Sequence, residues 1–321
     1  MRKNNLTWIP FLALTISCLV GLTVGPGGFG LGLGPDIMRL RLLRLGLSLL
    51  AGIGLSSSGA ALQAILGNPL AEPYLLGVAG GAACGAALSI ISGLQKTFLG
   101  SMAAPLLAML FDIAVMVLVY RLSLVKGRLL SETVILAGMV VNAFLSGLIM
   151  LFMVLAGRQL PEILWLLMGS LSFAFSENFT QLFLLASILV LAASLYLFFQ
   201  SRSLNLLSLG EAQAQSLGVE VEGFKRKVFF AVGLSVAAVV SLCGVIGFVG
   251  LMMPHLARMI SGPDNRRLLP LSCLLGASLL ILADAGARTL APQELPLGVI
   301  MAMLGGPFFI YLLWQRRRQQ S

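Results

Sequence analysis

Long apolar runs separated by short polar connectors occupy the whole chain. Most runs approach the ~20 residues that a helix needs to cross a bilayer. Runs such as 182–199 do not alternate apolar and polar residues, as the strands of a membrane barrel would. The pattern therefore predicts an all-α membrane protein that forms a single polytopic domain over residues 1–321. We place about ten transmembrane helices at 7–24, 46–66, 74–93, 99–120, 132–155, 180–199, 227–245, 247–260, 268–290 and 297–314.

The positions of lysine and arginine decide how the stretch from Lys227 to Arg258 is divided. This stretch is long for one span and short for two. Cytoplasmic loops are enriched in Lys and Arg. Two spans with a cytoplasmic N-terminus leave only six of the 21 basic residues outside, whereas one span leaves eleven outside. We therefore predict two spans with a break near Gly244, Gly247 and Gly250, and both termini in the cytoplasm.

The composition argues against several classes of function. Of the 321 residues, 58% are hydrophobic and 10% charged, against about 25% charged in soluble domains. The net charge is +9. In a membrane protein the placement of Lys and Arg first indicates the orientation of the chain, so we expect no nucleic-acid partner. The sequence lacks the G-x-x-x-x-G-K-[ST] pattern of phosphate-binding loops, has one histidine, and holds its four cysteines inside apolar runs. We expect no enzyme activity, no metal and no cofactor bound by this chain.

The polar connector from Ser203 to Lys227 joins the sixth and seventh predicted spans. Ser208 and Glu211 have the spacing of a capping box, in which the two side chains satisfy free N–H groups at the start of a helix. We predict a short helix over 209–217 that ends at Gly218. So short a helix is unstable alone in water, and we expect it to dock on its own bundle, on a partner or on both. The alternative is a solvated loop with one incidental turn.

Arginines gather in the first predicted outer loop, residues 25–44, on the side where basic residues are not favoured. One explanation is that Arg39, Arg41 and Arg44 extend to lipid headgroups near a helix end. The other, supported by Arg288 on the same side, is that they bind acidic groups of an external partner. Guanidinium and carboxylate groups form planar bidentate pairs, which suits such a docking site.

Two connectors have the composition of rigid breaks. The segment from Asn68 to Pro73 contains two prolines, which forbid a continuous helix. The outer segment 161–169 begins with proline, has an acid in its first turn and ends in glycine, which predicts a short helix. This helix is either part of a gate or an interfacial anchor that places Trp165 at the membrane surface.

Asp112 and Asp284 are the carboxylates that the sequence places deep in spans, where ionisable groups are costly and often functional. Asp284 and Arg288 lie four residues apart on one helix, which favours a structural pair. A proton relay is the alternative for Asp112, and it makes an ion-coupled secondary transporter using Asp112 or Asp284 the second candidate function. We assign His255, beside Pro254, a structural hydrogen bond at the inner surface.

Six stretches combine glycine, proline and charged residues in a distinctive order. They are Leu40–Arg44, Asn68–Pro73, Gly210–Glu211 with Leu217–Gly218, Gly247–Gly250 with Pro254–His255, Glu294–Gly298, and Gly305–Phe309. Together they resemble the FecCD/BtuC family, the permease subunits of ATP-driven importers for iron-siderophores, haem and cobalamin. The stretches keep the order of that family from about residue 36 to 317.

The resemblance implies a BtuC-like permease fold and an assembly with partners. It implies a homodimer in the bacterial or archaeal inner membrane, with two ATP-binding cassette subunits on the cytoplasmic side and a substrate-binding protein outside. ATP and Mg would be bound by the cassette subunits. The choice among iron-siderophore, haem and cobalamin as the substrate stays open.

The same resemblance implies roles for individual residues. It makes the connector the element that couples the permease to the ATPase, through Leu209, Gly210, Glu211, Ala214, Leu217 and Gly218. Arg41, Arg44 and Arg288 match arginines that receive the binding protein, although Leu43 stands where the family usually has proline. Because a bundle that alternates between two states bends at Gly and Pro breaks, we also expect gate or hinge positions. These are Asn68, Pro69, Glu72, Pro73, Lys126, Gly127, Pro161, Gly169, Gly247, Gly250 and Pro254.

Overall fold

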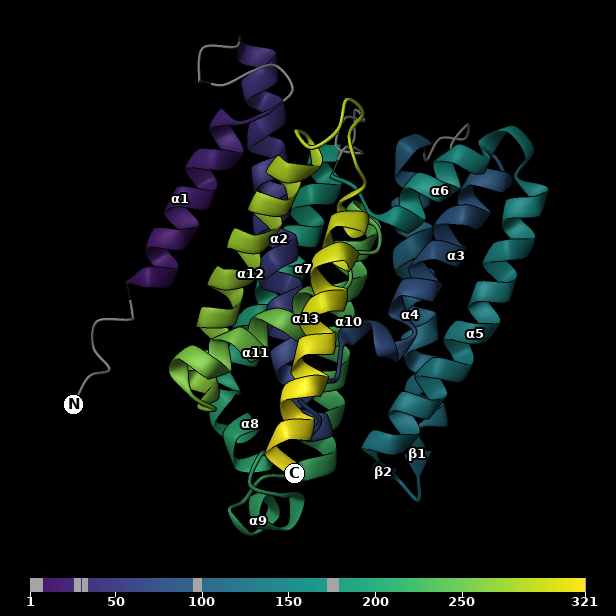
Figure 1. Cartoon of the computed structure of the whole chain (residues 1–321). Helices are drawn as coiled ribbons and strands as arrows, with labels where there is room; N and C mark the ends of the chain where they lie inside the picture. The colour runs from purple at the N-terminus through teal and green to yellow at the C-terminus, as the bar shows by residue number, and fades with distance from the viewer. Residues whose placement is uncertain (1–7, 26–29, 31–33, 95–99, 172–178, 321) are drawn as a thin grey trace.

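The computed structural model describes residues 8–25, 30, 34–94, 100–171 and 179–320. Helices make up most of these ranges (Figure 1). The long elements are α1 (Ile9–Thr23), α2 (Pro35–Leu66), α3 (Val78–Ile91), α4 (Ala103–Leu122), α5 (Ser131–Leu155), α7 (Phe179–Phe199), α10 (Val221–Cys243), α11 (Val249–Ser261), α12 (Asn265–Ala287) and α13 (Leu297–Gln320). The short ones are η1 (Pro73–Leu76), η3 (Gly100–Met102), η4 (Gly157–Gln159), α6 (Leu160–Met168), α8 (Ser201–Leu207), α9 (Glu211–Ser216), and strands β1 (Leu124–Val125) and β2 (Arg128–Leu129).

Each of the ten intervals predicted from the apolar runs overlaps one of the long helices. Six of these helices, α2, α4, α5, α7, α10 and α12, are long and apolar enough to cross a membrane, and three shorter apolar helices lie at 9–23, 78–91 and 297–312. The predicted break near Gly244 to Gly250 is confirmed, because α10 ends at Cys243 and α11 begins at Val249.

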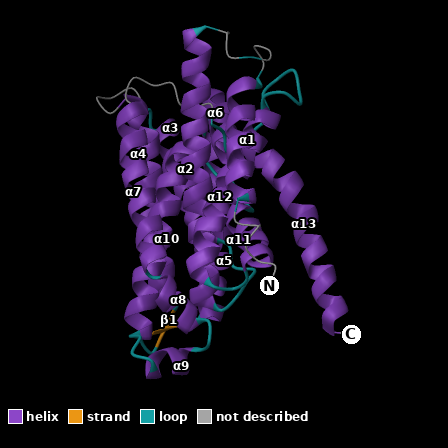
Figure 2. Ribbon diagram, turned by 90° about the vertical axis from the view of Figure 1, so that its left-hand side faces the viewer, coloured by secondary structure: helices purple, strands orange, loops and turns teal. Residues whose placement is uncertain are grey.

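Helix α2 forms the centre of the bundle, and Figures 1 and 2 show it among α7, α10 and α12. Of its most apolar stretch, 83% is buried. Glycines bring neighbouring backbones against it: a Cβ added at Gly59 would overlap the carbonyl of Gly250 in α11, and one at Gly276 of α12 would overlap Ser56. Small residues allow such close contact between membrane helices, so α2 is held by backbone-to-backbone packing on several sides.

Helices α3 to α6 form a second group beside this centre (Figure 1). In this group α3 packs closely on α4, because Gly81 and Gly85 leave no space for a side chain against residues of α4. The strands β1 and β2 form an antiparallel hairpin between α4 and α5, with Leu124 opposite Leu129. Its turn is Lys126–Gly127, and both residues have positive φ, at 51° and 79°.

The start of α2 is the helix boundary that differs most from the prediction. Helix α2 begins at Pro35, not at 46, with proline in its first turn and Asp36 there, which are favourable residues at a helix start. Arg39, Arg41 and Arg44 therefore lie on a helix and not in a loop. Helix α13 leans away from the other helices toward its C-terminal end (Figure 2).

Candidate functional site

The two interruptions predicted as hinges meet inside the bundle. After α2, Gly67 has φ of 58° and the chain is non-helical until η1 begins at Pro73. The Glu72 carboxylate accepts a hydrogen bond from the backbone N–H of Phe248. The Tyr74 hydroxyl accepts one from the N–H of Ile246 at 3.0 Å. The backbone N–H and C=O groups of a non-helical segment inside a membrane need hydrogen-bond partners within the protein. Here side chains of the first interruption accept hydrogen bonds from N–H groups of the second.

Gln63 of α2 joins the same two interruptions. Its Nε2 donates to the carbonyl oxygens of Ala71 and Gly250, each at 3.3 Å, and its Oε1 accepts from Arg258 Nη2 at 3.0 Å. Gln63 is 3% exposed. A side chain on Gly250 would also meet Pro73, whose Cδ lies 2.8 Å from the position of the added Cβ. The predicted hinge residues on either side are therefore one packed unit, which we call the hinge junction (residues 63, 71–74 and 246–250).

Phe248 has a strained backbone within the hinge junction. Its φ is 70°, in the left-handed region that residues with a side chain seldom adopt. A Cβ added at Gly305 of α13 would overlap the Phe248 ring, so that glycine makes room for the ring. Strain of this kind persists only where the surroundings enforce it and is concentrated at functional sites. The junction thus holds a high-energy conformation at the start of α11.

The predicted short outer helix is confirmed as α6. It has Pro161 in its first turn, Glu162 as the acid, and Gly169 with φ of 68° at its end. The carbonyl of Gly169 accepts from the N–H of Leu297 at 2.9 Å, and Cys243 O accepts from Ser170 N at 2.9 Å. The end of α6 is therefore bonded to the end of α10 and to the start of α13.

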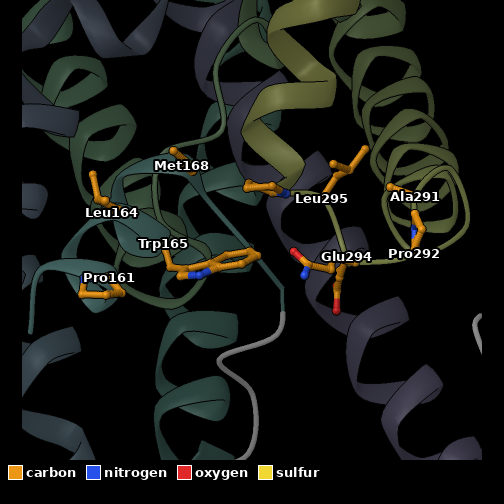
Figure 3. Close-up of a pocket in the computed structure, with 10 residues that line it drawn as sticks. Pro161, Leu164, Trp165, Met168, Ala291, Pro292, Glu294 and Leu295 are labelled. Carbon is orange, nitrogen blue, oxygen red and sulfur yellow. The ribbon is translucent and has the colours of Figure 1, made fainter.

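A pocket of about 630 Å³ opens beside α6. Figure 3 shows the Trp165 ring reaching from α6 toward the loop that carries Glu294. Trp165 is 40% exposed. The lining is mainly apolar and consists of Pro161, Leu164, Trp165, Met168 and residues 291–296. The pocket lies at the same end of the molecule as the arginines that the sequence singled out.

Those arginines do not present their charges to solvent. Arg41, Arg44 and Arg288 are 4%, 7% and 6% exposed. Arg288 Nε lies 3.0 Å from Asp284 Oδ2, and Arg44 pairs with the same Asp284 at 3.7 Å and with Glu294. The predicted pair of Asp284 and Arg288 is thereby confirmed.

The remaining contacts tie this group to α1. Arg41 Nη1 donates to the carbonyl oxygens of Leu22 and Gly30 at 2.6 and 2.9 Å, and Arg288 Nη2 donates to Gly21 O at 3.2 Å. The expectation that the three guanidinium groups face an external partner thus differs from this structure, where backbone carbonyls and carboxylates of the same chain surround them. We call Arg41, Arg44, Asp284, Arg288 and Glu294 the outer network.

The connector after α7 folds into two short helices instead of one. The predicted capping box is wrong, because the Ser208 hydroxyl donates to Leu204 O at 2.9 Å and so closes α8. The N-cap residue of α9 is Gly210, which has φ of 118°, and Ser208 is the C-cap residue of α8.

The surface of α9 has the features expected of a contact element. Gly218 has φ of 88° just after the helix, consistent with its predicted place at the helix end. Ala214 is fully buried, whereas Leu209 and Leu217 are 61% and 60% exposed. Figure 1 places α9 at the end of the molecule opposite α6.

Lys225 of α10 holds α9 in place, which the sequence analysis missed. Its side chain is 1% exposed and pairs with Glu211. Its Nζ also donates to the carbonyl oxygen of Leu129 in β2 at 3.0 Å, and the N–H of Leu129 donates to Glu222 Oε2 at 2.9 Å. We call these four residues the inner network. From the sequence, Lys225 is only one of the basic residues predicted to be cytoplasmic. Its burial could not be predicted, because it depends on a hairpin far away in the chain.

Asp112 and His255 lie apart from both networks. Asp112 is fully buried on α4, and neither carboxylate oxygen has a hydrogen-bond partner among the described residues. The His255 ring packs edge-on against Phe308 with ring centroids 5.9 Å apart.

Comparison with known proteins gives consistent matches over nearly the whole chain. A profile described as the FecCD transport family matches residues 35–315. The ABC transporter permease protein YvrB of Bacillus subtilis is 38% identical, with 97% of this chain and 93% of that protein covered. The hemin transport system permease protein HmuU of Yersinia pestis is 37% identical, with 88% and 84% covered. A solved metal-chelate type ABC transporter in an inward-facing conformation superimposes with a TM-score of 0.84 at 33% identity, covering 96% of this chain and 98% of that one.

Proposed function

We propose, from the premise that this chain belongs to the FecCD transport family, that it carries an iron-siderophore, haem or cobalamin across the membrane after delivery by a substrate-binding protein. The chain is an ABC importer permease of that family. The observation that carries the proposal is the family match over residues 35–315 on a fold that superimposes along nearly its full length.

The proposed assembly is a homodimer with ten spans in each chain and both termini in the cytoplasm of a bacterial or archaeal cell. Exposed apolar side chains on α5 and α13, for example Phe144, Val154 and Met303, which are 71%, 81% and 70% exposed, would face lipid or the second copy in this assembly. Two ATP-binding cassette subunits, which hold the ATP and Mg, would contact α9. The exposed Leu209 and Leu217 suit such a contact.

In the proposed mechanism, ATP-driven movement of α9 changes the packing at the hinge junction. The junction is suited to this role because it joins α2, the segment before α3, and the start of α11 through a few hydrogen bonds. Packed elements of this kind have discrete alternative arrangements and do not deform continuously. Lys126–Gly127 lie just before the start of α5, and Pro161 and Gly169 lie at the start and the end of α6. Movement at these places would open or close a path.

Docking of the binding protein is proposed for the outer face, around the outer network and the pocket beside α6. Because Arg41, Arg44 and Arg288 are bonded internally, their contribution requires Arg44 and Arg288 to exchange carboxylate partners and Arg41 to leave its backbone carbonyls. Arg39, one turn away on α2, is exposed. Charge reversal at Arg39 should weaken docking in a manner that depends on salt, and unchanged docking at low salt would remove this surface from the proposal.

A second candidate function is an ion-coupled secondary transporter. The fully buried carboxyl of Asp112, which has no hydrogen-bond partner in the described part of the chain, favours it, since buried ionisable groups in spans often mark ion pathways. Asp284 supports it less, because it is committed to two arginines.

One experiment separates the two candidates. The chain is reconstituted in liposomes with the ATPase and the binding protein that co-purify with it, and uptake of a ferric siderophore, haem and cobalamin is measured. We expect uptake that requires ATP hydrolysis, survives Asp112→Asn, and is lost with Glu211→Ala. Uptake driven by an ion gradient without the ATPase, and abolished by Asp112→Asn, would overturn the proposal in favour of the second candidate.

A further inference from the structure

A fully buried lysine of α10, beside α9, donates hydrogen bonds to two acceptors from different parts of the chain. Lys225 donates to Leu129 O at 3.0 Å and pairs with Glu211 of α9. Burying an ammonium group is unfavourable unless it is paired and hydrogen-bonded. The two acceptors meet this requirement only while α9 and β2 both keep their places against α10.

The hairpin that Lys225 contacts is itself rigidly attached. Leu129 N donates to Glu222 Oε2 at 2.9 Å, on the same turn of α10 as Lys225. The hairpin is closed at its base, where Thr133 Oγ1 donates to Ser123 O at 2.8 Å. A displacement of the lysine therefore acts on the hairpin as a unit.

From the hairpin, contacts lead to the end of α2, next to the hinge junction. Ser131, the first residue of α5, donates from its hydroxyl to Leu66 O at 2.6 Å. Leu66 is the last residue of α2, immediately before the interruption at Gly67. A continuous series of bonded groups thus runs from α9 through Lys225 and β2 to the place where α2 ends.

We propose that Lys225 is the positioning residue that links α9 to the β1–β2 hairpin, so that movement imposed on α9 reaches α5 and the interruption after α2. This inference rests on the proposed function, because it assumes that ATPase subunits move α9. A fully buried lysine and a half-exposed glutamate fit the role: the lysine anchors the link inside the chain, while Glu211 stays accessible to a partner.

The test compares Lys225→Met with Lys227→Met in the assembled transporter. Lys227 lies two residues further on the same helix and is exposed, so it is a matched control. ATP hydrolysis is measured with and without the loaded binding protein. In Lys225→Met we expect stimulation to fall at least about fivefold while unstimulated hydrolysis stays within about twofold. In Lys227→Met both rates stay at the wild-type level.

The outcomes distinguish a link from a merely structural residue. A lysine needed only for folding would lower both rates together, and wild-type stimulation in Lys225→Met would overturn this inference alone. A wild-type chain that assembles with no ATPase would overturn the proposed function and this inference with it.

If the Lys225→Met protein accumulates poorly in cells, a second variant provides the test. Glu222→Ala removes the other anchor of Leu129 and leaves no buried unpaired ammonium group. It should lower stimulation by about twofold to fivefold, whereas Glu220→Ala, at an exposed neighbouring position, should not. Full stimulation in Glu222→Ala would contradict the link through the hairpin.

Discussion

The outer and inner networks both bury basic side chains, but their acids differ in exposure. In the outer network the Asp284 side chain is 5% exposed, and the Arg44 and Arg288 side chains that share it are 8% and 4% exposed. In the inner network Lys225 is 1% exposed, whereas its partner Glu211 is 53% exposed. The acid that Arg44 and Arg288 share is buried, and only the second acid on Arg44, Glu294, reaches solvent, at 36% exposed. In the inner network the acid that pairs with the buried lysine is itself half in solution.

Because of this difference, the outer network is suited to stabilising the fold, and the inner network is suited to transmitting a movement. The outer network joins α1, α2 and α12 through Arg41, Arg44 and Arg288, and Asp284 cannot leave without stranding the buried charge of Arg288. Removing one partner of a buried ion pair is strongly destabilising, even where the pair as a whole adds little. In the inner network water can solvate the Glu211 carboxylate when it moves, and Leu129 O still accepts from the buried Lys225 Nζ, so part of the bonding of the lysine is kept.

The largest effect is expected from Asp284→Ala. It leaves the Arg288 guanidinium without its carboxylate and Arg44 with Glu294 alone, and should destabilise the chain by about 3 to 5 kcal/mol. The measurement is thermal or denaturant unfolding of the purified protein in detergent. Asp36→Ala, at an exposed position of α2, is the control. Equal stability of the Asp284→Ala and Asp36→Ala proteins would show that the outer network does not hold these helices together.

Lys225→Met should cost less, about 1 to 3 kcal/mol, since the main loss is an unsatisfied carbonyl at Leu129. Glu211 then turns to water. The same unfolding measurement applies, with Lys227→Met as the control. A loss as large as that of Asp284→Ala would mean that the inner network is as closed as the outer one, and the contrast between them would fail.

The helices could be predicted from the sequence, because apolar runs of sufficient length mark them directly. The start of α2 was missed although Pro35 and Asp36 are ordinary signals of a helix start, because the glycine-rich segment before them suggested a longer loop. The capping box at Ser208 failed for a different reason. The hydroxyl had an equally close acceptor in α8, and local spacing does not decide between the two.

The functional sites divide in the same way. Prolines and glycines located both interruptions, but their contact through Glu72 and Phe248 joins residues that are far apart in sequence and depends on how the helices pack. The bonds of Arg44 to Glu294 and of Lys225 to Leu129 also join residues that are far apart in sequence. Sequence patterns report local geometry, so they identified residues of the hinge junction individually and missed the lysine that connects the β1–β2 hairpin to α9.

Glu72→Gln tests the region between the two networks and should have a smaller effect. Glutamine keeps an acceptor for the Phe248 N–H and loses its charge, and charged acceptors exceed neutral ones by about 1 kcal/mol. We expect a loss of stability of that size, with Glu132→Gln, at an exposed position of α5, as the control. A gain in stability would show that the carboxylate is poorly placed and that the hinge junction is held by packing alone.

The smallest effect is expected at Asp264, which caps α12 on the inner side. Its carboxylate accepts from Asn205 Nδ2 at 2.6 Å and from Arg266 N at 3.1 Å. The Asn205 amide first, and then the backbone N–H, hold the pKa of this carboxyl below its usual value. A lowered pKa in the folded state adds stability above the pKa of the unfolded chain, and this stability is lost as pH falls through the folded value.

Asp264→Asn should therefore be less stable than the wild type at pH 7 by less than about 1 kcal/mol, as is usual for exposed charged contacts. The difference should shrink as the pH is lowered past the pKa of this group. Unfolding of both proteins from pH 7 to pH 3 measures it, and the comparison cancels the titration of the other carboxylates. Asn205→Ala removes the main donor and should reduce the same pH-dependent difference. A difference that stays constant across this range would mean that the charge of Asp264 adds nothing and that only its capping geometry matters.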